Sequence, residues 1–458
     1  MLLEFRVKNC KSFKEELFFS MEPAPKQKGL DYSILKKKIG RKTYKALCSS
    51  VVYGANASGK TNIINVMDAF KEILLRGNIE DGNGGHIQNV SADKLMFLPN
   101  KDNKEDVPVE FYIKFILDNT LIEYSLHINL GSFLNRNYER CISFEELKIN
   151  EELIYTVKED SDSLVEIKLN ENFEKLKKLL PNDFSKRYKT ECDLEQTMTL
   201  FSFLEKPEID NISMKKQLPK TDIFLMNTFK VVFSEELAKA IKTWIIESFI
   251  VMPMCNVHVL PARDENGTVR YDYSMNRAIK AFAAAANELT YFKDSEGNPI
   301  LLSAISDNRY VKSDVFESYG TIRFAELFPL ICEALDNGRV LVMDEFDASM
   351  HPTVISSIIN LFHNDEINKN GAQLIFNTHN PIFLDSRLFR RDEIKLVEWD
   401  NATGSNVYTL ADFKTSGANA VRKNENLMKN YLEHQYGAIM DVDLSSCFGD
   451  VYVNAEEW

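Results

Sequence analysis

Residues 54–61 read Gly-Ala-Asn-Ala-Ser-Gly-Lys-Thr and fit the spacing G-x-x-x-x-G-K-[ST]. Phosphate binding needs several backbone N–H groups at short range, and Gly54 and Gly59 let the backbone curl without a clashing Cβ. Lys60 is placed to reach the β- and γ-phosphates of ATP, and Thr61 to offer its hydroxyl to Mg²⁺. The predicted nucleotide contacts in and beside this loop are Gly54, Asn56, Ser58, Gly59, Lys60, Thr61 and Asn62.

The flanking residues supply the setting that such a loop requires. Residues 49–53 form an apolar run typical of a buried strand, and residues 61–75 have helical periodicity. The apolar positions on one face of that predicted helix are Ile63, Val66, Met67, Phe70 and Leu74. Strand, glycine loop and helix in this order predict an α/β fold built around a phosphate site.

Composition limits the class of protein. The 458 residues carry a net charge of −13, and 44% of them are hydrophobic, as in ordinary globular proteins. A chain that mainly wraps nucleic acid is usually basic, so this balance disfavours extensive contact with a phosphate backbone. Apolar runs stay short of the ~18–20 residues of a membrane span, and residues 1–8 do not resemble a signal peptide. We therefore expect a cytoplasmic protein without membrane contact.

Two residue types admit both a structural and a functional interpretation. The seven cysteines are scattered and lack a C-x-x-C pair, which predicts free and mostly buried thiols. The basic cluster at 36–38 and 41–42 fits a solvated loop or hairpin better than a DNA contact.

Hydrophobic periodicity divides the chain into four predicted regions. Alternating apolar residues predict antiparallel hairpins over 109–130 and 147–157, and helical spacing predicts a packed insertion without a long coiled coil. The predicted regions are an N-terminal lobe with the phosphate loop (1–171), a helical insertion (172–250), a C-terminal lobe (251–420) and a tail (421–458).

The second half alternates helices and strands, which predicts a parallel sheet with its ligand site at the carboxyl ends of the strands. The predicted strands are 339–343 and 373–377, and the predicted helices are 322–335 and 352–362. Asp344 and Glu345 follow the first strand, and His379 follows the second. Asp344 is expected to hold Mg²⁺ and Glu345 to polarise the attacking water, while His379 is expected to reach the γ-phosphate.

Residues 318–321, Ser-Tyr-Gly-Thr, precede the helix predicted from residue 322. A helix N-terminus with serine and glycine forms an anion site, although in isolation the same residues are a common helix cap. The order of phosphate loop, insertion, Ser-x-Gly, Asp-Glu, Asp and His resembles the ATP-binding-cassette superfamily, in its Rad50/SMC-like and OLD-like branch. The resemblance implies an ABC-type ATPase fold, with a mixed N-terminal β-subdomain, a parallel-sheet core and a helical insertion.

In that family, the serine-glycine signature of one subunit closes over the nucleotide held by another. The resemblance therefore implies a homodimer or higher homo-oligomer in which Ser318, Gly320 and Thr321 contact ATP across the interface. Asp347 matches the family's D-loop, and residues 9–13 match its N-terminal Asn-Phe-x-Ser-Phe pattern with Cys10 in place of phenylalanine. Tyr319 stands where many transport relatives have glycine, and Gln88 is a poor match for the Q-loop, which stays unassigned.

Residues 388–394 and 431–438 are similar to a prokaryotic anti-phage subgroup of OLD-like ATPases, which includes RloA, AbiL-type ATPases and the AriA subunit of PARIS. Roughly 80 residues follow His379, fewer than the ~100 of a further catalytic domain, and Asp441-Val-Asp443 reads as an acidic tail. No nuclease is therefore expected in this chain.

The resemblance implies an ATP-hydrolysing sensor or scaffold that controls a separately encoded effector, with a phage protein or DNA as the trigger. The alternatives are a Rad50- or RecF-like DNA repair ATPase and, less well supported, the ATPase subunit of a membrane transporter.

Overall fold

A computed structural model describes residues 1–25, 27, 29–79, 98–102, 107–132, 138–159, 165–204, 220–253, 271–293, 299–306, 309–413 and 425–440. Gln88, Cys255, the tail motif Asp441–Asp443 and Cys447 lie outside the described residues.

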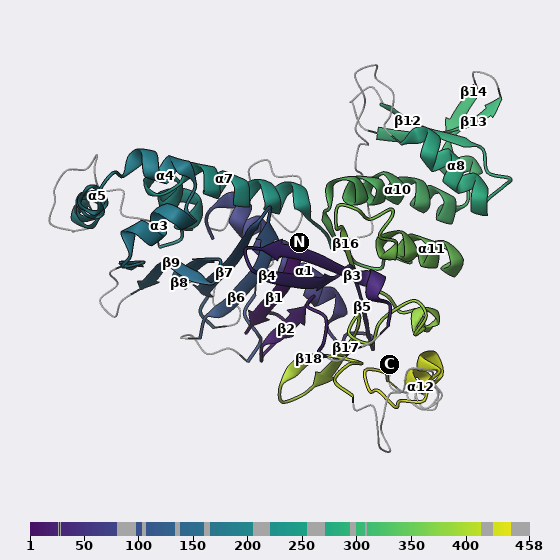
Figure 1. The fold of residues 1–458 in the computed structure, drawn as a ribbon. Coiled ribbons are helices and arrows are strands. Elements are labelled where there is room, and N and C mark those ends of the chain that lie inside the picture. Colours follow the sequence, from purple (N-terminus) through teal and green to yellow (C-terminus); the bar gives the residue numbers. More distant parts are fainter. Residues whose placement is uncertain are drawn as a thin grey trace, which may run out of the picture.

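Alternating apolar residues near the N-terminus build a seven-stranded antiparallel sheet (Figure 1). Its strands lie in the order β10-β9-β8-β7-β6-β1-β2. Their bounds are β1 Leu2–Lys8, β2 Leu17–Ser20, β6 Val109–Leu117, β7 Thr120–Asn129, β8 Cys141–Ile149, β9 Glu152–Glu159 and β10 Val165–Leu169. Both predicted hairpins are confirmed, with Val109 opposite Ile128 in the first and Ile149 opposite Glu152 in the second.

The phosphate loop follows β5, a strand of the second sheet. This sheet has six strands in the order β11-β15-β16-β5-β17-β18. Their bounds are β5 Ser49–Gly54, β11 Phe249–Met252, β15 Val340–Met343, β16 Gln373–Asn377, β17 Ile394–Asp400 and β18 Gly404–Thr409. All neighbours pair in parallel except β17 and β18. All six residues of β5 are buried, as expected for a parallel strand that is covered on both faces.

The six-stranded sheet is a central layer between two apolar cores. Val52 and Val342 belong to one core, whereas their neighbours Val51 and Leu341 belong to the other. On the first side, α1 (Lys60–Arg76) packs between the two sheets, where Phe70 contacts Phe5, Phe111 and Tyr124 of the antiparallel sheet. On the second side lie α10 (Tyr319–Asn337) and α11 (Pro352–His363). The predicted α/β class, with a parallel-sheet core and a helical insertion, is confirmed, although the N-terminal sheet, which was expected to be mixed, is antiparallel throughout.

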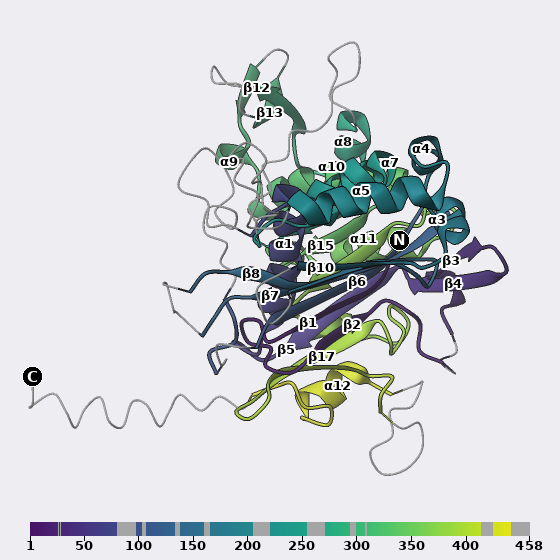
Figure 2. The same cartoon turned by 90° about the vertical axis from the view of Figure 1, so that its left-hand side faces the viewer.

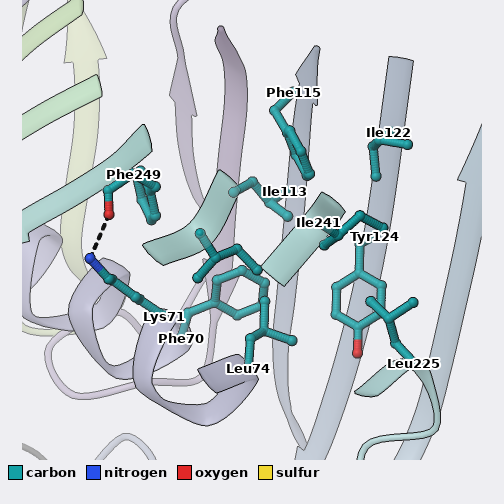
Figure 3. Close-up of a pocket in the computed structure, with 11 residues that line it drawn as sticks. Phe70, Lys71, Leu74, Ile113, Phe115, Ile122, Tyr124, Leu225, Ile241 and Phe249 are labelled. Atoms are coloured by element: carbon teal, nitrogen blue, oxygen red, sulfur yellow. Dashed lines mark hydrogen bonds between the residues drawn. The ribbon is translucent and has the colours of Figure 1, made fainter. Parts of the chain in front are cut away.

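The predicted helical insertion lies beside the antiparallel sheet (Figures 1 and 2). Its helices are α3 Phe173–Leu179, α4 Asn182–Arg187, α5 Glu191–Leu204, η2 Leu225–Phe229, α6 Lys230–Val232, α7 Glu235–Thr243 and η3 Trp244–Ser248. The junction of this segment with α1 and the sheet encloses an apolar cavity of about 10 Å³, at whose edge Lys71 Nζ donates to the Phe249 carbonyl at 2.7 Å (Figure 3). A space of this size admits at most one water molecule, so this junction is packed core and not a ligand pocket.

Several elements were not predicted. A three-stranded antiparallel sheet lies beyond α10, formed by β12 (Glu288–Lys293), β13 (Pro299–Ser306) and β14 (Arg309–Lys312). The remaining elements are η1 Asp31–Ser33, β3 Ile34–Ile39, β4 Lys42–Leu47, α8 Asp272–Phe282, α9 Ser313–Phe316, η4 Pro381–Phe383 and α12 Leu427–Leu432. The basic cluster at 36–38 and 41–42 is exposed on the β3–β4 hairpin, which confirms the predicted solvated hairpin. Among the described helices, none is both long and apolar enough to cross a membrane.

Lys395, on β17, is buried against Phe19 of β2, so its burial can be used to test how the two sheets pack against each other. Its ammonium is buried, 4.7 Å from the Phe19 ring centroid, and burial lowers its pKa from 10.5 to about 8 against the opposing effects of Asp392, Glu393 and Asp412. Because the unfolded chain binds this proton more tightly, Lys395 imposes its full cost on stability below about pH 8, and this cost disappears as the pH rises from 8 to 10.5. We predict that Lys395→Met raises the free energy of unfolding by about 1–3 kcal/mol at neutral pH.

Urea unfolding of both proteins at neutral and at alkaline pH measures this effect. The advantage of Lys395→Met should shrink above pH 8. An advantage that is absent at neutral pH, or equal at both pH values, contradicts a buried charge at this position.

Candidate nucleotide site

The phosphate loop joins the carboxyl end of β5 to the N-terminus of α1, as its sequence predicts. Ala57 and Gly59 have φ angles of 61° and 111°, so the backbone curls through left-handed conformations. A Cβ on Gly59 would lie 2.8 Å from Ser12 Oγ and closer still to Ser405 Oγ. Glycine is therefore required at residue 59 both for its backbone angle and for the space around it.

The back of the loop rests on two segments that are distant in sequence. Ser405 Oγ, on β18, donates to the Ser58 carbonyl at 2.6 Å, and the Ser405 N–H donates to the Ser12 carbonyl at 2.8 Å. Asn62 Nδ2 donates to Ser12 Oγ at 2.8 Å. Sequence reasoning missed Ser405, because no local pattern indicates that β18 reaches the loop.

Lys60 and Ser58 fit an anion in this loop. Lys60 Nζ donates to the carbonyls of Gly54 and Ala55, both at 2.8 Å, and burial lowers the pKa of Lys60 to about 8 despite Asp344 and Glu345 nearby. Ser58 Oγ is buried and has no hydrogen-bond partner among the described residues. A phosphate oxygen would satisfy this orphaned hydroxyl and the buried ammonium together. Asn56 is exposed on the loop.

The side chains of Asp344 and Thr61 are in contact at the carboxyl edge of the six-stranded sheet. Thr61 Oγ1 donates to Asp344 Oδ1 at 3.2 Å, and Asn377 Nδ2 donates to the same oxygen. Burial raises the pKa of the Asp344 carboxyl, while these two hydrogen bonds act in the opposite direction. A carboxylate and a hydroxyl are the oxygen ligands that Mg²⁺ prefers, so the donor set fits that ion.

Glu345 and His379 complete the group at this edge. Glu345 is exposed and adopts a φ of 45°, and its N–H donates to Asn377 Oδ1 at 2.6 Å. Partial burial and then the charge of Lys60 lower the pKa of His379, whereas Glu345 and Asp347 act to raise it. The structure therefore brings the phosphate loop, the acid pair and His379 close enough for their charges to influence one another.

The predicted signature lies against the predicted D-loop. Ser318 caps α10, accepting from the Thr321 N–H at 3.2 Å, and its hydroxyl lies 2.8 Å from Thr321 Oγ1. A Cβ on Gly320 would lie 2.5 Å from the carbonyl oxygen of Ser349, in the turn that Asp347 begins. Ser318 is exposed, whereas Thr321 is buried, which leaves Ser318 better placed for an external ligand.

A second polar cluster lies at the opposite end of β5. Cys48, His363 and Glu393 are buried and offer ligand atoms within 4.8 Å of one another. Ser49 Oγ bridges two of them, at 2.8 Å from His363 Nε2 and at 3.0 Å from Glu393 Oε1. Because hydrogen bonds within the protein engage both groups, we interpret this cluster as a structural network rather than a metal centre.

Residues 262–385 match a family model described as "AAA domain, putative AbiEii toxin, Type IV TA system". This segment includes the signature, the acid pair and His379, whereas the phosphate loop precedes it. No curated protein matches the chain.

Among the solved structures that resemble the chain are two SMC heads. An SMC head bound to the C-terminal winged-helix domain of ScpA is 10% identical, with a TM-score of 0.38 over 89% of this chain and 97% of that one. An SMC head domain from Thermotoga maritima is 12% identical, with a TM-score of 0.35 over 89% of this chain and 98% of that one. Scores this low carry no weight for function. The family match is to an AAA domain over residues 262–385, which is consistent with an ATPase.

Gly59→Ala tests the loop geometry. The new Cβ would meet Ser12 and Ser405 in a left-handed backbone. We predict at least a tenfold loss of ATP affinity, equivalent to about 1.4 kcal/mol, measured by titration calorimetry.

Gly40→Ala is the matched control, because Gly40 also has a positive φ, of 58°, but a Cβ there would meet nothing within 4 Å. It should cost about 1 kcal/mol of stability and leave ATP affinity unchanged. Equal ATP affinities for the two variants would show that Gly59 is not needed for the site.

Proposed function

We propose that this chain binds ATP with Mg²⁺ at the carboxyl edge of β5, β15 and β16 and hydrolyses it. The observation that carries this proposal is the contact between Thr61 and Asp344 beside the buried ammonium of Lys60. A phosphate-binding helix terminus, an oxygen donor pair for a divalent cation and an exposed carboxylate are thus gathered at one place.

Each side chain then has a specific role. Lys60 binds the β- and γ-phosphates, while Thr61 and Asp344 hold Mg²⁺, which neutralises charge on the phosphates when it is bound. Glu345 orients the attacking water and accepts its proton. His379 donates a hydrogen bond toward the γ-phosphate.

We further propose that a second copy of the chain completes the site. Ser318 is exposed at the start of α10, and Gly320 packs on the turn of Asp347, so both predicted interface motifs form one surface. By the family resemblance, this surface covers the nucleotide of the partner, and ATP binding therefore assembles the oligomer. We also propose that the chain is organised in the four regions predicted from its sequence, with boundaries at residues 171, 250 and 420.

The assembly is proposed to sense phage infection and to control a separately encoded effector. The anti-phage resemblance of residues 388–394 and 431–438 supports this role, and the description of the matched family refers to a toxin–antitoxin system. The alternative is a DNA-binding repair ATPase, whose candidate DNA contact is the exposed lysines 36–38 on the β3–β4 hairpin. ATP hydrolysis that DNA stimulates in a salt-sensitive manner would support that alternative.

We predict that Lys60→Ala weakens ATP binding at least about tenfold, because the loop loses its buried cation. Glu345→Gln should keep wild-type ATP affinity but slow turnover about 100-fold or more, because the general base is lost. Steady-state hydrolysis and nucleotide titration of the two variants separate the two roles. Glu345→Gln turning over at the wild-type rate contradicts the role given to Glu345.

We predict that Glu345→Gln, loaded with ATP, retains its effector from cells that express the neighbouring genes. The ATP-bound assembly persists in this variant because hydrolysis does not dissolve it. Affinity purification with mass spectrometry measures the retention, with Lys60→Ala as the control that does not load. The same set of proteins on both variants would contradict ATP-dependent control of an effector.

A further inference from the structure

Asn377 is the last residue of β16 and lies between the two strands that carry the proposed chemistry. β16 pairs with β15 on one side and with β5 on the other, both in parallel. The side chain of Asn377 is buried, with 2% of its surface exposed. A buried amide in this position must find partners for both its oxygen and its nitrogen.

Both ends of this amide are bound to the acid pair. Asn377 Nδ2 donates to Asp344 Oδ1, the oxygen that also accepts from Thr61 Oγ1. Asn377 Oδ1 accepts from the Glu345 N–H at 2.6 Å. One side chain therefore holds the carboxylate of the first acidic residue and the backbone of the second.

The bond to Glu345 acts on an uncommon backbone conformation. Glu345 has a φ of 45°, which residues other than glycine rarely adopt and which costs about 1–2 kcal/mol. This turn ends β15 and leaves the Glu345 side chain exposed, whereas the four residues of β15 are buried. By accepting from the Glu345 N–H, Asn377 Oδ1 stabilises this turn. It therefore fixes the backbone position from which the Glu345 side chain extends.

We propose that Asn377 is a positioning residue for ATP hydrolysis, which holds Asp344 and Glu345 in register with each other and with the phosphate loop. This inference rests on the proposed function. Asn377 is not assigned a contact with ATP or with the attacking water. Its effect is transmitted through the two acidic residues, so its loss should impair turnover and the response to Mg²⁺ more than nucleotide binding.

Threonine and valine at residue 377 form a matched pair for the test. They have nearly the same shape and both favour β-strands, but only threonine has a hydroxyl, which can replace one of the two hydrogen bonds that the asparagine amide makes. Four quantities are measured for wild type, Asn377→Thr and Asn377→Val. They are kcat, the Mg²⁺ concentration for half-maximal rate, ATP affinity in EDTA and the melting temperature.

We expect Asn377→Val to lower kcat about 10- to 100-fold and to raise the Mg²⁺ requirement, as losses of supporting contacts in metal sites do. Asn377→Thr should recover part of this loss. ATP affinity in EDTA should stay within about threefold of wild type in both variants, because the phosphate loop is unchanged. The melting temperature of each variant confirms that it is folded.

Equal kcat values for the threonine and valine variants would overturn the inference. A fall in EDTA-measured ATP affinity that parallels the fall in kcat would also overturn it, because it would show a general structural role. Absence of hydrolysis by the wild type itself would refute the proposed function, and this inference with it.

Discussion

The hydrogen bond between Thr61 and Asp344 is the contact on which the proposed site depends. It joins the first turn of α1 to the end of β15, although 283 residues separate the two positions. β16 lies between β15 and β5, so the strands that carry the acid pair and the loop are about 10 Å apart. Asn377, at the end of β16, is hydrogen-bonded to Asp344 and Glu345, and the Asp344 oxygen that it binds also accepts from Thr61.

The rest of the fold keeps these parts in register. Five parallel strands align their carboxyl ends at one edge, and α1 is held between two sheets by Phe70 and its aromatic neighbours. The hairpin of β17 and β18 closes the sheet beyond β5 and brings Ser405 behind the loop. Loss of packing around α1 is therefore expected to disturb the conformation of the phosphate loop, even though Phe70 itself makes its contacts with the antiparallel sheet.

Much of this arrangement follows from sequence patterns that are local. The phosphate loop, the strands that end at Met343 and Asn377, and the hairpins of the antiparallel sheet are each specified by a motif or by a period of apolar residues. The roles of Ser405 and Asn377 were not predictable, because each depends on which strands become neighbours. Such pairing is determined by the packing of the whole chain and leaves no signal within a window of ten or twenty residues.

The sheet of β12–β14 was missed for a different reason. Much of the apolar surface of its strands is exposed, as at Phe292, Ile305 and Tyr310. Without one consistently buried face, the alternation that predicts a strand is weak. The same reasoning explains why the antiparallel sheet, with one face packed on α1, was readily predicted.

A mixing experiment tests most directly whether one ATP site is built from two copies of the chain. Lys60→Ala removes the loop cation, and Ser318→Arg blocks the signature surface, so each variant alone should be inactive. In a random mixture of dimers, half are mixed, and each mixed dimer has one intact site. Mixing equal amounts should therefore restore about one quarter of the wild-type ATPase rate. A Ser318→Arg protein that is active alone, or a mixture that stays inactive, would contradict the composite site.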